Sequence, residues 1–275
     1  MPITLRHIIT EKRRKPKRLL RPIMPSTATE IWYRNELIKL AKQVKISVDA
    51  LLVAPLKTRF DWEQSLTTDS AIDEIDNWLV KITGHLSDYF TAKALYLAHL
   101  AAKRALKSTD DRLAAELKRS LSINVKPFFT QSGPIKSQMD KAIATNVDLI
   151  KSIPVEYLAK VKTRVIDHYT EGARWETMVN AIHEVYSVTE SRAKLIARDQ
   201  MAKMNSSFNQ VRQESVGIEE YIWQTSGDER VRPTHVENDG KTFRWDSPPE
   251  ETGHVGSDVN CRCNALPVIN LEGFR

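Results

Sequence analysis

Apolar side chains recur every three or four residues through most of the sequence before Gly217, which is the period of an amphipathic helix. Ser26 or Thr27 can serve as the N-cap of the first helix, and Gly217 is a suitable stop after the last one. Two interruptions are expected, at Pro154 and in the stretch "KPFFTQSGP" (Lys126 to Pro134). The pattern predicts helices over residues 26–55, 69–107, 110–121, 135–152, 155–169, 175–185 and 189–215.

The period changes after Gly217. The runs "EYIWQTS", "KTFRW" and "CNALPVI" are short and rich in aromatic or β-branched residues, and Gly, Pro and Asp separate them, which is typical of short strands. The predicted fold class is therefore α+β, with a mainly helical N-terminal body of long helices and a small β-rich C-terminal cap. The expected division is an arm over 1–25, a helical domain over 26–133, and a second domain over 134–275 with helices in 135–216 and the cap in 217–270.

Charge separates the N-terminal arm from the rest of the chain. The chain has a formal net charge of +6, but residues up to Pro22 contain eight basic side chains and one acid, so the remainder is nearly neutral. Such an arm is expected to be extended and mobile until it meets an acidic partner, with nucleic acid as the first candidate and a solvated tail as the alternative. Its basic residues are Arg6, Lys12, Arg13, Arg14, Lys15, Lys17, Arg18 and Arg21.

Composition excludes several other classes of protein. Apolar residues make up 41% of the chain, which is enough for a buried core. No run of about 18 apolar residues predicts a membrane span, and the N-terminus lacks the apolar segment of a secretory signal. We therefore expect a soluble protein without a membrane partner.

The cap contains both cysteines of the chain, Cys261 and Cys263, in the stretch "NCRCNALPVI". On a strand they would project to the same face, and together with His235 and His254 they could form a tetrahedral zinc site. Only one residue separates the two cysteines, whereas zinc ribbons and fingers prefer two or more. Buried reduced thiols are therefore the competing interpretation, because free cysteine packs well in cores.

His235 also raises an enzymatic alternative. A histidine near several acids could activate water for a metal-dependent nuclease or a toxin-like enzyme. No phosphate-binding glycine loop, Gly-x-Ser-x-Gly elbow or His-Glu-x-x-His helix occurs in the sequence. We therefore expect no catalytic residues and no small-molecule substrate.

The string from "ARDQMAKMNSSFNQVRQ" to "NCRCNALPVI" closely resembles the C-terminal domain of the phage Mu F-like minor head proteins, also called head morphogenesis proteins. The resemblance covers roughly residues 146–269, within the 134–275 domain. Its most specific positions are Trp223, Thr225, Asp228, Arg230, Asp239, Gly240, Asn260, Cys261, Arg262 and Cys263.

The resemblance implies a non-enzymatic virion component in the head interior, present in the host cytoplasm during assembly. The partners it implies are the portal protein, other head components and DNA. A free DNA-binding protein that acts through the basic arm remains an alternative. Many relatives have a Cys-x-x-Cys pair where this chain has "RPTH", with Arg232 and His235 at the cysteine positions. His254 would then be a replacement zinc ligand, or Arg232 would take the place of the metal by bonding to carbonyls or carboxylates in a metal-free cap, which we favour from the sequence.

Overall fold

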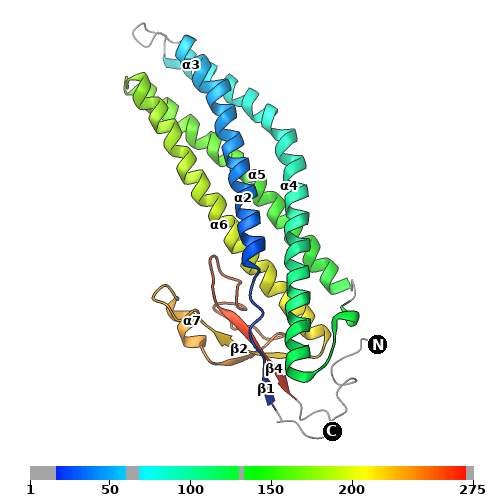
Figure 1. The fold of residues 1–275 in the computed structure, drawn as a ribbon. Coiled ribbons are helices and arrows are strands. Elements are labelled where there is room, and N and C mark those ends of the chain that lie inside the picture. Colours follow the sequence, from blue (N-terminus) through cyan, green and yellow to red (C-terminus); the bar gives the residue numbers. More distant parts are fainter. Residues whose placement is uncertain (1–16, 60–67, 130–132, 271–275) are drawn as a thin grey trace. The chain divides into compact units, whose positions relative to one another are not determined.

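The computed structural model describes residues 17–59, 68–129 and 133–270 (Figure 1). Four long helices dominate these residues, and a small antiparallel sheet is formed mainly by the C-terminal part of the chain, which confirms the α+β prediction. The long helices are α2 (Thr27–Val48), α4 (Thr68–Leu121), α5 (Gly133–Thr170) and α6 (Trp175–Ser215). Shorter elements are the π-helical turn Asp49–Val53, α3 (Ala54–Arg59), the 3₁₀ turn Lys126–Phe128 and α7 (Pro233–Asn238). No described helix combines the length and the apolar character of a membrane-spanning segment.

The chain packs as two compact units, each built from separate parts of the sequence. We call the first the cap unit: it comprises the chain up to Glu30, Leu100–Ala142 and the chain from Arg198 onward. The second, the helical unit, comprises Ile31–His99 and Ile143–Ala197. Because α2, α4, α5 and α6 each cross a boundary between these ranges, the units cut across the divisions expected at residues 25 and 133.

The structure corrects three predicted helix boundaries. Residues 108–109 do not interrupt α4, because Thr109 is fully buried and Asp110 pairs with Arg212 instead of capping a new helix. Pro154 lies inside a continuous α5. Thr189, predicted as an N-cap, lies inside α6, where its hydroxyl donates to the carbonyl of Val185. The predicted cap at Ser26 is confirmed, since its hydroxyl accepts the backbone N–H of Thr29.

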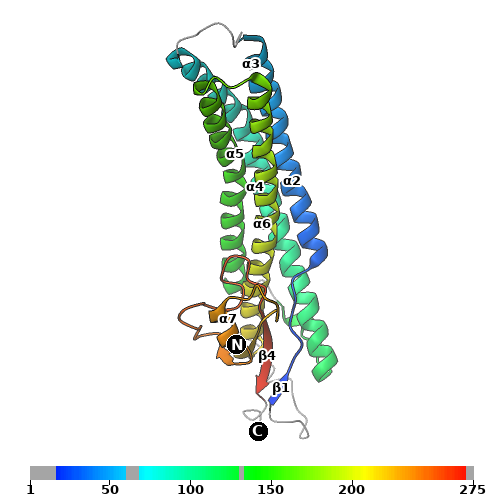
Figure 2. The same cartoon turned by 90° about the vertical axis from the view of Figure 1, so that its left-hand side faces the viewer.

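The sheet has the strand order β1-β4-β2-β3, with every neighbouring pair antiparallel. Three strands come from the predicted cap: β2 (Glu220–Gln224), β3 (Thr242–Arg244) and β4 (Asn264–Asn270). The fourth, β1 (Lys17–Leu19), comes from the predicted arm and lies beside β4 (Figure 2). Leu20 and Ile23 are buried in the same unit, so residues 17–25 differ from the flexible arm expected there. Burial of these two apolar side chains and the backbone pairing of β1 with β4 hold this segment against the sheet.

Two apolar clusters form the core of the cap unit. One gathers Leu20 and Ile23 with α4 side chains such as Leu117 and with Ile269 of β4. The other is aromatic and lies under β2 and the following loops; it contains Tyr221, Trp223, Trp245, Val255, Cys261 and Cys263. A buried ion pair joins α6 to α4, with Arg212 donating to both carboxylate oxygens of Asp110 at 2.7 and 3.0 Å. The second cluster positions the candidate site.

The helical unit has an apolar core, and polar pairs also join its helices. Tyr33 of α2 is fully buried and donates its hydroxyl to Asn146 of α5 at 2.7 Å, and burial raises the pKa of this phenol. Lys162 of α5 pairs with Asp76 of α4 at 2.7 Å. These contacts fix the register of α5 against two neighbours within the unit.

Candidate functional site

Cys261 and Cys263 lie in the turn that leads into β4, and both are free, buried thiols. Asn260 precedes them with a positive φ of 59°, which turns the chain sharply before the pair. Arg262, between them, points to the other side, where its guanidinium forms a bidentate pair with Asp228 at 2.5 and 2.6 Å. The expected alternation therefore places both sulfurs on the inner side of the turn.

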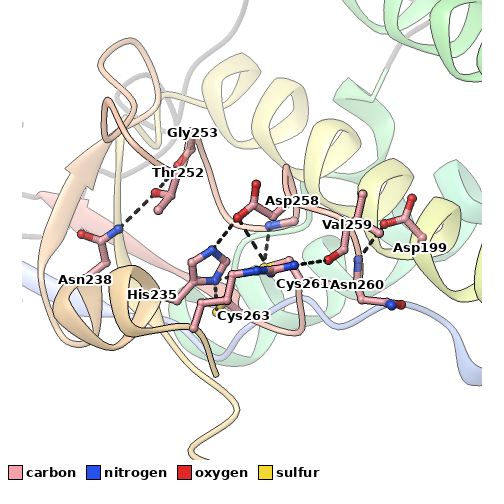
Figure 3. Close-up of polar contacts among 12 residues, drawn as sticks. Asp199, His235, Asn238, Thr252, Gly253, Asp258, Val259, Asn260, Cys261 and Cys263 are labelled. Carbon is pink, nitrogen blue, oxygen red and sulfur yellow. Dashed lines mark hydrogen bonds and ion pairs between the residues drawn. The ribbon is translucent and has the colours of Figure 1, made fainter. Parts of the chain in front are cut away.

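His235 meets the two sulfurs from α7. Pro233 is the first residue of this six-residue helix, where its fixed φ fits, and His235 is only 2% exposed. Its Nδ1 lies 3.3 Å from Sγ of Cys263 and 3.7 Å from Sγ of Cys261 (Figure 3). The three ligand atoms lie within 4.8 Å of one another. The described chain thus brings together three of the four residues predicted as zinc ligands.

Asp258 fixes the orientation of the imidazole. Its carboxylate lies 2.9 Å from Nε2 of His235 (Figure 3). A carboxylate can only accept here, so Nε2 carries a proton, and this contact directs Nδ1 toward the sulfurs. Sequence reasoning did not identify Asp258, although an acid three residues before Cys261 was visible in "SDVNC".

Arg232 lies outside the cluster. Its guanidinium donates to the carbonyl of Val259 at 2.8 Å and lies 3.8 Å from the Asp258 carboxylate. The expectation that Arg232 bonds to a nearby carbonyl therefore matches its placement. However, its side chain is 46% exposed, so Arg232 contacts the loop around Val259 from the solvent side and does not lie between the buried sulfurs.

His254, the fourth predicted ligand, is not brought to the cluster. Nδ1 lies 2.9 Å from the hydroxyl of Tyr221, and Nε2 lies 3.0 Å from the carbonyl of Trp245. Its ring also packs against both aromatic rings. Burial lowers the pKa of His254, against an opposing effect of its hydrogen bond to the backbone at Trp245. Both ring nitrogens are therefore used in the aromatic core.

The two thiols differ in their surroundings. Cys261 accepts the backbone N–H of Gly256 at 3.3 Å. The hydrogen bond from the Cys263 thiol, together with the backbone N–H groups of Cys263 and Gly256, lowers the pKa of Cys261 to about 6 despite its burial. The same thiol pair and burial raise the pKa of Cys263. The pair thus favours one thiolate, located at Cys261.

Gly256 itself has no room for a side chain. Its φ is +81°, and a Cβ there would lie 2.9 Å from Cβ of Ser206 on α6. The Ser206 hydroxyl also donates to the carbonyl of Val255. The loop that carries the N–H donor to Cys261 is therefore pressed directly against α6.

The remaining signature residues hold the cap together. Trp223 is 1% exposed and meets the His235 ring edge-on at 5.3 Å between centroids. The other contacts join turns and loops: Asp239 accepts the N–H of Thr225, Asp228 accepts that of Arg230, Gly240 turns with a φ of +75°, and Asp199 of α6 accepts the N–H of Asn260. Asp199, in the "ARDQ" segment, was not singled out from the sequence.

The predicted basic contact residues divide into two groups. Lys17 and Arg18 are exposed on β1, and Lys17 lies 3.8 Å from Glu220. The backbone N–H of Arg21 donates to Glu116 of α4 at 2.9 Å. The rest lie outside the described residues: Arg6, Lys12, Arg13, Arg14 and Lys15.

The fold and the site define a mainly helical protein with a small antiparallel cap, in which two thiols and one imidazole converge. Residues 159–266 match the family model described as "Phage Mu protein F like protein", and this range contains His235 and both cysteines. The match confirms the resemblance: residues 159–266 are similar to the phage Mu F-like proteins.

One relative is similar over nearly the whole chain. It is a protein of Haemophilus influenzae (strain ATCC 51907 / DSM 11121 / KW20 / Rd) described as "Uncharacterized protein", with 31% identity over 266 residues. The alignment covers 95% of this chain and 58% of the relative, so the chain spans little more than half of that protein's length. No solved structure matches the chain.

Proposed function

We propose that this protein is a minor structural component of a phage head, acting in head assembly together with the portal protein, other head components and DNA. The observation that carries the proposal is the family match over residues 159–266, which includes most of the cap and its signature positions. The proposed location is the head interior, after synthesis and assembly in the host cytoplasm.

The contacts of the signature residues favour a structural role over catalysis. The carboxylates of Asp228 and Asp239 accept backbone N–H groups in turns, and Trp223 packs in the core. His235, the base of the nuclease alternative, is 2% exposed and faces two sulfurs and a carboxylate. A nuclease base must reach the scissile phosphate of a large polymer. The buried ring of His235 is not accessible to such a substrate. We therefore propose that the protein has no enzymatic activity.

The basic N-terminal segment supplies a candidate contact with DNA. It leads directly into β1, which is hydrogen-bonded to the cap, so a partner bound by the arm would be held next to the sheet edge. Each phosphate contact made by a Lys or Arg releases counterions, and binding should therefore weaken steeply with salt. The same positive charge would suit an acidic surface on the portal.

The assembly role is tested in particles. An antibody to this chain would be used to blot gradient-purified DNA-filled heads and empty procapsids after induction or infection of the host. The proposal expects the chain in these fractions at a few copies per particle. Its absence from every head and procapsid fraction would overturn the assignment.

The DNA contact is tested with a variant that leaves the cap intact. Removing residues 1–22 would also remove β1 and buried Leu20, so the informative deletion covers residues 1–16. A matched control of unchanged length replaces Lys12, Arg13, Arg14 and Lys15 by Gln. Both variants should lose most of the affinity for duplex DNA and flatten the dependence of log K on log salt by about 0.9 for each phosphate that is no longer neutralised. Unchanged affinity in both would reject the arm as the DNA contact.

A further inference from the structure

We infer that His235, Cys261 and Cys263 bind one zinc ion, with Asp258 as the positioning residue that orients the imidazole, and that His254 is not a ligand. The inference does not depend on the role in head assembly. It rests on four features of the cap unit: the spacing of the ligand atoms, the orientation of the ring, the donors to the sulfurs, and the cavity beside them.

The two sulfur–nitrogen separations fit a tetrahedral ion. Zinc bonds of about 2.3 Å to sulfur and about 2.0 Å to nitrogen, at tetrahedral angles, place a sulfur and a nitrogen roughly 3.5 Å apart. The observed separations from Nδ1 of His235 are 3.3 Å to Cys263 and 3.7 Å to Cys261, on either side of that value. Shifts of about 0.2 Å would bring both sulfur–nitrogen separations to that value.

The imidazole is oriented as a metal ligand requires. A histidine that binds zinc through one nitrogen usually donates its other N–H to a carboxylate or carbonyl. Here Asp258 accepts from Nε2 at 2.9 Å, which leaves Nδ1 facing the sulfurs as the atom that would bind the metal. Arg232 in turn holds the same loop through Val259. The Asp258 carboxylate thus contacts the His235 imidazole, and the imidazole contacts both sulfurs.

The sulfurs are surrounded by donors that suit thiolates. The backbone N–H of Gly256 points at Cys261 at 3.3 Å. Trp223, whose indole N–H is buried, lies in the same core cluster as both cysteines. Two thiolates and one neutral imidazole compensate the charge of Zn²⁺, so the buried centre carries no net charge.

Soft sulfur donors and an imidazole in one cluster favour zinc over the hard cations magnesium and calcium, which prefer oxygen.

The fourth coordination position is provided by a cavity of about 480 Å³ in the cap unit, lined by both cysteines, Ser206 and Asn209. The buried side-chain oxygen of Asn209 lacks a hydrogen-bond partner among the described residues, so the cavity offers a polar site for water. Water from this cavity completes the coordination.

A metal would also stabilise the stretch between β2 and β4, which has little regular secondary structure. Between β2 and β4 the chain forms only the short α7 and β3, and the rest consists of turns and loops. Zinc would join α7 to the start of β4 across these loops. Metal binding that requires the folded site stabilises the fold by the free energy of binding.

The first test measures metal in the full-length protein. The chain would be purified in reducing buffer, incubated with zinc, dialysed against metal-free buffer and analysed by inductively coupled plasma mass spectrometry. We expect about one zinc ion per chain. Cobalt-loaded protein should show intense visible d–d bands and a near-ultraviolet thiolate-to-cobalt band. A folded wild-type protein without bound zinc, whose two thiols react freely, would overturn the inference.

Variants then test the ligand set. Cys261→Ser, Cys263→Ser and His235→Gln should each lose most of the zinc, while the matched control His254→Gln should retain it. Asp258→Asn should keep the site but weaken its zinc affinity by 10- to 100-fold, as for other groups that orient metal-bound histidines. Retained zinc in His235→Gln, or equal losses in the two histidine variants, would refute the proposed ligands.

A measurement on the wild type covers the case in which cysteine variants fail to fold. Titration of native protein with a mercurial thiol reagent in the presence of a zinc indicator should release one zinc ion as the two thiols are modified. X-ray absorption at the zinc edge should give two sulfur and two nitrogen or oxygen neighbours. Four light-atom neighbours, or zinc released without thiol modification, would contradict coordination by the cysteines.

Discussion

Replacing Arg212 by Met should destabilise the cap unit through the charge that it leaves behind. Arg212 is 2% exposed, and both of its hydrogen bonds to Asp110 join α6 to α4. Burial raises the pKa of Asp110, while the hydrogen bonds from Arg212 act in the opposite direction. Met fills most of the space of the Arg stem, so the main loss is the partner of a carboxylate whose side chain is only 19% exposed. Breaking such a pair costs about 3 kcal/mol.

The double variant Arg212→Met, Asp110→Leu provides the decisive comparison. If the cost comes from an unpaired buried charge, removing the second charge should restore a large part of the lost stability. Urea denaturation followed by circular dichroism would give the free energy of unfolding, and hydrogen exchange of residues 218–270 would report the cap alone. A loss of about 3 kcal/mol corresponds to roughly 100-fold faster exchange. A single variant that loses less than about 1 kcal/mol, or a double variant no more stable than the single one, would refute this reasoning.

Three further results are expected. Gly256→Ala should cost about 3 kcal/mol of stability, because the strained positive φ adds to the collision of the new Cβ with Ser206. Gly240→Ala, which has a positive φ but open space around its Cβ, should cost about 1 kcal/mol. Equal losses for the two variants in thermal denaturation would contradict the collision. Tyr33→Phe should lose about 1–2 kcal/mol in urea denaturation because it removes the buried donor to Asn146, and an unchanged midpoint would count against that bond. Burial lowers the pKa of His254 in the folded protein, so the unfolded chain binds a proton at this ring more readily. The resulting stability is fully present above about pH 6.5 and is lost as pH falls through the folded-state pKa. His254→Gln should therefore flatten the decline in melting temperature between these two pH values.

The helices were predictable because their apolar period is local, but several of their ends were not. Asp110 follows Ser and Thr and was interpreted as the start of a new helix, whereas its carboxylate pairs with Arg212, which lies 102 residues further along the chain. The burial of Thr109 likewise depends on neighbours that periodicity does not reveal. Tertiary contacts therefore override capping preference at this position.

The candidate site was predictable in part for the same reason. Alternation alone places Cys261 and Cys263 on one side, and the sequence also named His235. The choice between His235 and His254 depends on where the loops return: one ring meets Asp258 and the sulfurs, and the other meets Tyr221. Loop closure of this kind leaves no periodic signal, so the sequence could not distinguish the two histidines.

The pairing of β1 with β4 has a consequence for how the protein folds during synthesis. The two strands come from opposite ends of the described residues, so on the ribosome the sheet stays incomplete until β4 has emerged. Closing so long a loop costs little stability, since each doubling of its length adds only about 0.6 kcal/mol, but such distant pairing is slow. Until β1 docks, β4 presents an open edge that β1 of a neighbouring copy could occupy. Crowded synthesis should therefore favour strand-exchanged dimers, and the local concentration of β1 on its own chain is what opposes them.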